Sequence, residues 1–65
     1  MLIGRMWKAC RYASKNHCMM KTEKNGTNLT ITIKYGKDII TVKQTADNIS
    51  TTPERVIEAV DKLIA

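Results

Sequence analysis

The sequence predicts a small α+β domain in the order helix, strand, strand, helix, and two patterns of apolar residues lead to that prediction. Residues 29–44 alternate apolar and polar side chains on either side of a Gly-Lys pair, which is typical of an antiparallel hairpin. Residues 2–18 and 52–64 place apolar side chains three or four positions apart, which is typical of amphipathic helices. The length of 65 residues allows one domain, 1–65, with a thin core. Chains of this size often gain support from a second copy, so we expect a homo-oligomer.

The first helix, residues 2–18, is predicted to have an apolar side and a basic side. At 100° per residue, the apolar side collects the residues that we expect at an interface, namely Leu2, Ile3, Met6, Trp7 and Cys10. The opposite side collects Arg5, Lys8, Arg11 and Lys15. We expect the apolar side to pack on the hairpin or on another copy of the chain. Trp7 is therefore expected to make an apolar contact rather than to stack on a base.

A polar link, residues 19–28, is predicted between this helix and the hairpin, with a turn at Asn25-Gly26. In the hairpin, residues 29–44, a two-residue loop at Gly36-Lys37 places Ile33 opposite Ile40. One face of the hairpin then carries Leu29, Ile31, Ile33, Ile40 and Val42. Two strands leave both edges of the sheet open, and open edges favour pairing with another chain.

The C-terminal helix, residues 52–64, is the predicted cover of the hairpin's apolar face. A polar loop, residues 45–51, precedes it, and Pro53 suits its first turn. Its apolar stripe consists of Val56, Ile57, Val60, Leu63 and Ile64. Because a two-stranded hairpin is only marginally stable alone, we expect this helix to complete the core.

The net charge of +5 is concentrated in the first third of the chain. Residues 1–24 contain six lysine and arginine residues against Glu23 alone, whereas residues 25–65 contain five basic and five acidic residues. Such asymmetry is typical of chains that bind nucleic acid, an anionic membrane surface or an acidic protein.

The reactive side chains do not form a catalytic or metal-binding pattern. On a straight helix, Cys10 would lie about 10–12 Å along the axis from His17 and Cys18, too far for a shared metal ion or a disulfide. His17 is the only histidine, and no nucleophile has an evident base, so we expect no enzyme, no metal and no cofactor. The chain has no apolar run long enough to cross a membrane and no secretory segment, so we expect a cytoplasmic location.

These observations predict a small non-enzymatic accessory protein that binds nucleic acid through phosphate contacts. The contacts are expected from Arg5, Lys8, Arg11 and Lys15, with support from Lys21 and Lys24. Lys34 and Lys43, on the hairpin's polar face, are expected to extend the same basic strip.

Two alternatives use other parts of the chain. The first is a protein-interaction module or inhibitor that acts through an exposed sheet edge or through the apolar side of the first helix. The second is a degenerate helix-turn-helix regulator, because residues 45–60 resemble that motif in the spacing of Ala46, Ser50 and Val56.

Overall fold

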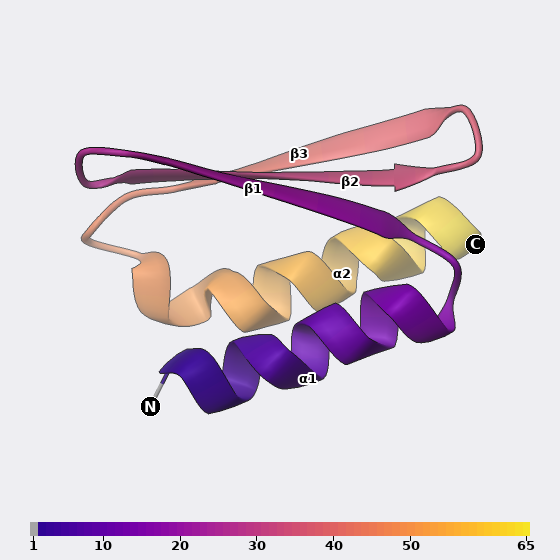
Figure 1. Ribbon diagram of the computed structural model, residues 1–65, viewed down its shortest axis with the longest axis horizontal. Helices are drawn as coiled ribbons and strands as arrows, with labels where there is room; N and C mark the ends of the chain where they lie inside the picture. The colour runs from indigo at the N-terminus through magenta and orange to yellow at the C-terminus, as the bar shows by residue number, and fades with distance from the viewer. Residues whose placement is uncertain (1) are drawn as a thin grey trace.

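The computed structural model describes the backbone of residues 2–65 and the side chains of residues 6–65. In chain order the elements are α1 (Leu2–Lys15), β1 (Met19–Asn25), β2 (Asn28–Tyr35), β3 (Asp38–Gln44), the 3-10 helix η1 (Ile49–Thr51) and α2 (Thr52–Ile64). The three strands form one antiparallel sheet in the order β1-β2-β3. Both helices lie on the same face of this sheet, so the domain has two layers (Figure 1).

The prediction of a two-stranded hairpin joined to the first helix by a polar link is wrong. Residues 19–25 form β1, which pairs with β2 along its whole length, from Met19 opposite Lys34 to Asn25 opposite Asn28. As an edge strand, β1 has one partner, and of its two methionines only Met20 packs against the core. It therefore needs almost no apolar residues and shows no hydrophobic alternation, although pairing with β2 satisfies the backbone N–H and C=O groups that are directed toward β2.

The β2–β3 hairpin has the predicted register. Tyr35 lies opposite Asp38, and Ile33 lies opposite Ile40. Gly36 opens the two-residue loop with a φ of 61°, a left-handed conformation that glycine adopts without a steric penalty.

The core lies between the inner face of the sheet and α2. Its largest fully buried apolar side chains are Ile31 and Ile33 from β2, together with Val56 and Val60 from α2. Figure 1 shows α2 lying nearer the sheet than α1, along β2 and β3. The α1 helix packs mainly on α2, with a smaller contact to β1.

The α1 helix ends three residues earlier than predicted. His17 has a φ of 63°, and the backbone N–H of Cys18 donates to Ala13 O at 2.8 Å while that of His17 donates to Ser14 O at 3.1 Å. This pair of hydrogen bonds around a left-handed residue is the Schellman motif that closes helices. The turn directs Cys18 into the core and starts β1 immediately afterwards.

Candidate nucleic-acid interface

The solvent side of α1 gathers three of the predicted phosphate-binding residues. An open depression on this side is lined by Trp7, Lys8, Arg11, Tyr12, Ser14 and Lys15. We call the five exposed members, all except the half-buried Tyr12, the α1 solvent face. Lys8, Arg11 and Lys15 follow one another at helical spacing and span about 10 Å along the axis.

The α1 solvent face is strongly cationic because α1 contains no acidic residue. Among the side chains of residues 6–65, the ion pairs are Lys21–Glu23 and Lys62–Glu58, and neither includes a residue of α1. The three cations of the face are therefore available to an external anion. Arg5 also belongs to α1 in sequence, but its side chain lies outside the described residues, as do those of Leu2 and Ile3.

Trp7 does not occupy the apolar position that the sequence predicts. Its side chain is 59% exposed, and the guanidinium carbon of Arg11 lies 5.2 Å from the centroid of its ring. This distance is within the range of a cation–π interaction. Trp7 thus belongs to the basic side of α1 rather than to the core.

The rotation of α1 about its axis explains this difference. Among residues 6–15 of the helix, Ala9 and Ala13 are buried, and Met6 and Tyr12 are half-buried beside them. Alanine at a helix contact lets the two backbones approach closely, so α1 turns these small residues toward α2. The larger side chain of Trp7 is thereby left in solvent, and Cys10 is exposed as well.

Tyr12, beside the α1 solvent face, forms a hydrogen bond with α2. Its hydroxyl donates a hydrogen bond of 2.5 Å to a carboxylate oxygen of Asp61. This hydrogen bond, followed by desolvation and by the negative charge of Asp61, raises the pKa of Tyr12 above its ordinary value. The contact limits how far the cationic helix can shift relative to the rest of the fold.

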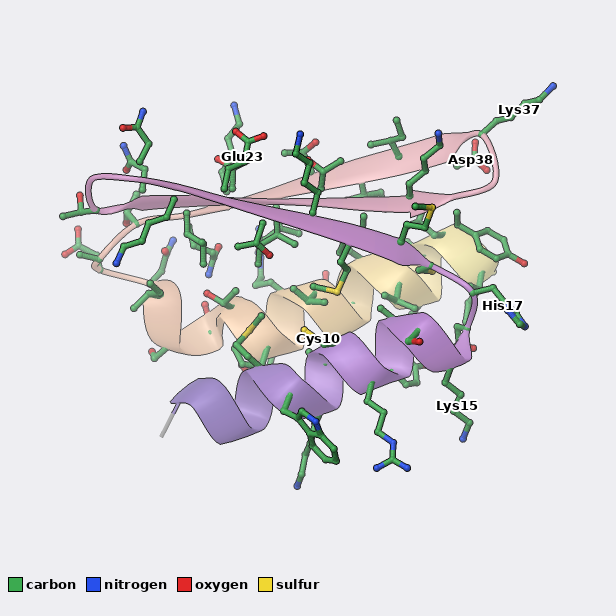
Figure 2. The ribbon with its side chains drawn as sticks, in the orientation of Figure 1. Cys10, Lys15, His17, Glu23, Lys37 and Asp38 are labelled. Carbon is green, nitrogen blue, oxygen red and sulfur yellow. The ribbon has the colours of Figure 1, made fainter. Side chains whose placement is uncertain are left out.

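The remaining predicted lysines do not join the α1 solvent face. By strand alternation, Lys21, Lys34 and Lys43 all point to the side of the sheet that faces away from the helices, which we call the outer sheet face. Figure 2 shows the two directions, because Glu23 projects from the outer sheet face while Lys15 projects from the opposite side of the molecule. Lys24 lies at the far end of β1, across from Leu29, and is exposed. The single basic strip predicted from the sequence is therefore divided between two surfaces.

The cysteines and the histidine have no metal-binding arrangement. Among the described residues, no group of three histidine, cysteine or acidic side chains is placed to hold an ion. Cys10 is an exposed free thiol, whereas Cys18 is buried, and burial raises the pKa of its thiol. His17 is exposed in the turn after α1.

The helix-turn-helix interpretation of residues 45–60 is wrong, because a strand rather than a helix precedes this segment. Residues 38–44 are strand, and the short η1 is the helical segment between that strand and α2. The first long helix that such a motif requires is therefore missing from this part of the described chain.

A second groove lies on the other side of α2. It is lined by Ile40, Thr41 and Val42 of β3 and by Arg55, Glu58, Ala59 and Lys62 of α2. The β3 strand is an edge of the sheet, so this groove runs beside unpaired backbone groups.

Comparisons with protein families, with curated proteins and with solved structures found no match to this chain. No helix within residues 2–65 combines the length and the apolar character needed to span a bilayer.

Proposed function

We propose that the protein is a small non-enzymatic accessory factor that binds nucleic acid through the α1 solvent face. The observation that carries the proposal is the stripe of Lys8, Arg11 and Lys15, which lies on a helix without an acidic residue. Cations that neutralise phosphates release condensed counterions, and this release drives binding that does not depend on sequence.

The packing of α1 against the rest of the fold supports the same proposal. Ala9 and Ala13 are fully enclosed against the rest of the fold, and Tyr12 is hydrogen-bonded to Asp61 of α2. A helix held at its packed side presents its cations in fixed relative positions, so less conformational entropy is lost when a phosphate backbone binds. Cys10 leaves a thiol exposed beside this surface, which suits a reducing compartment such as the cytoplasm.

The salt dependence of binding tests the proposal. The purified chain is titrated against labelled single-stranded and duplex oligonucleotides at salt concentrations from about 50 to 200 mM. Three or four phosphate contacts predict that log K falls against log salt with a slope of roughly −2 to −4. Absence of binding at the lowest salt would remove the proposal.

The groove between β3 and α2 favours a second candidate function, a protein-interaction module. A two-residue hairpin loop is closed by a hydrogen-bonded pair, here Tyr35 and Asp38, and such pairs alternate along the ladder. The backbone N–H of Thr41 is therefore directed away from β2, toward the open edge. An extended peptide, or β3 of a second copy, would add there as a further strand.

Thr41→Pro separates the second candidate from the first. The substitution removes an edge N–H without removing a hydrogen bond of the β2–β3 ladder. Loss of self-association in analytical ultracentrifugation, with oligonucleotide binding retained, would assign association to the edge of β3. A monomeric wild-type chain would rule out a homodimer through this edge.

A further inference from the structure

Trp7 is the feature of the α1 solvent face that phosphate binding alone leaves unexplained. It is the only tryptophan of the chain, and the fold leaves 59% of its side chain exposed. Tryptophan brings more apolar surface to a small core than any other residue, so a thin-cored domain that keeps it in water forgoes a large stabilisation.

The surroundings of the ring match one kind of ligand. Arg11 lies over the ring at 5.2 Å, and Lys8 and Lys15 line the same depression. A nucleobase stacks on an aromatic ring while neighbouring cations hold the phosphates on either side of it. A phosphate backbone without bases would contact the cations but would have no group to stack on the ring.

We propose that the α1 solvent face binds single-stranded nucleic acid by stacking an unpaired base on Trp7. This inference rests on the proposed function and names the class of nucleic acid that the site takes. A base within a duplex is already paired and stacked, so it reaches the ring only after it leaves the helix. A single strand offers its bases freely, and because every base has a π-face the contact tolerates any sequence.

Charge and stacking predict opposite preferences, which makes the inference testable. Duplex DNA has the higher charge density, so a purely electrostatic surface binds it at least as tightly as a single strand and with the steeper salt slope. Stacking on Trp7 reverses this order and gives the single strand the higher affinity.

The test uses the fluorescence of Trp7, which reports on this site alone because the chain has no other tryptophan. The probes are a thymidine oligonucleotide of about 12 residues and a sugar–phosphate strand of equal length and charge that lacks bases. We expect the thymidine strand to quench the fluorescence and to bind about 5- to 150-fold more tightly than the strand without bases. Equal affinities for the two strands would overturn the stacking inference and leave the proposed function intact.

Substitution of Trp7 supplies an independent test by fluorescence anisotropy of labelled strands. Trp7→Ala is expected to lose the preference for the thymidine strand, while Trp7→Phe keeps part of it. The matched control is Met19→Ala, which truncates an apolar side chain that is 72% exposed on the outer sheet face. If Trp7→Ala binds the thymidine strand as tightly as the wild type does, the ring is not a stacking platform. If neither strand binds the wild-type chain at low salt, the proposed function fails as well.

Discussion

The α1 solvent face and the outer sheet face are both exposed and both basic, but they differ in what accompanies the charge. Lys8, Arg11 and Lys15 lie beside an exposed indole ring on a helix without acidic residues. On the outer sheet face, Lys21 is paired with Glu23 at 3.4 Å, and threonines separate the lysines. The comparison teaches that net charge alone does not identify a binding surface, because the absence of acidic residues from α1 and the presence of an exposed aromatic ring distinguish the two.

The inner and outer faces of the sheet differ in how much the stability of the fold depends on them. Ile33 is fully buried under the helices, whereas Ile39, on the neighbouring strand, is 56% exposed on the outer sheet face. Ile33→Ala is expected to lower the free energy of unfolding by about 2–5 kcal/mol. Ile39→Ala is expected to change it by less than about 0.5 kcal/mol, as measured by urea denaturation. A comparable loss for Ile39→Ala would mean that another chain covers the outer sheet face.

Matched charge removal compares the two faces directly. The triple variant Lys8→Gln, Arg11→Gln and Lys15→Gln carries the same net charge as the triple variant Lys21→Gln, Lys34→Gln and Lys43→Gln. At about 1 kcal/mol for each charge-assisted contact, the α1 variant is expected to lose roughly 100-fold in oligonucleotide affinity and most of the salt slope. The sheet variant is expected to stay within a few-fold of the wild type. Equal losses in both would show that overall charge, rather than the α1 solvent face, determines binding.

The turn between α1 and β1, which separates the two faces, contains a residue whose substitution is expected to raise the stability of the fold. His17 has a φ of 63°, at the helix position where glycine is most common. His17→Gly is expected to stabilise the fold by up to about 1 kcal/mol, which corresponds to a rise in Tm of roughly 4–8 °C for a domain of this size. Asn16→Gly is the control, because Asn16 has no positive φ and its side-chain amide donates to Tyr12 O at 2.8 Å. A fall in Tm for His17→Gly would show that the imidazole contributes more than its backbone conformation costs.

The attachment of α1 to α2 has a pH dependence of a definite sign. Because the hydrogen bond to Asp61 raises the folded-state pKa of Tyr12, its stabilising contribution is complete below the ordinary value of 10.0 and is lost as pH rises through the higher folded value. The wild-type Tm is therefore expected to fall more steeply than that of Tyr12→Phe above about pH 10, the ordinary tyrosine value. Thermal unfolding of both proteins between pH 8 and pH 11 measures the difference, and parallel curves would contradict it.

Local patterns predict those elements whose residues carry their own signal. The register of β2 on β3 follows from alternation and a two-residue loop, and both are properties of neighbouring residues. The α2 helix follows from its apolar stripe and Pro53 in the same way. For β1 there is no such signal, since an edge strand with one open face needs no apolar alternation and is stabilised by pairing with β2.

The candidate site shows the same division. Its cations are identifiable from the sequence as one side of an amphipathic helix, and Lys8, Arg11 and Lys15 do lie together. The sequence pattern assigned Trp7 to the apolar side because it weighs residues by hydrophobicity, whereas the fold buries Ala9 and Ala13 among residues 6–15 and leaves Trp7 exposed. The sequence does contain one signal for that rotation, namely two alanines four residues apart, Ala9 and Ala13, which mark the side of the helix that another helix can approach closely.

By itself, the amino-acid sequence determined the helical periods, the hairpin register and the excess of positive charge in the first third of the chain. Only the tertiary structure decided how that charge is distributed, because the left-handed turn at His17 and the pairing of β1 with β2 place Lys21, by strand alternation, on the outer sheet face. Glu23 on the same face projects to the opposite side of the molecule from Lys15 (Figure 2). The tertiary structure also decided the exposure of Trp7, because the rotation of α1 depends on contacts with residues about fifty positions away, which no local pattern contains.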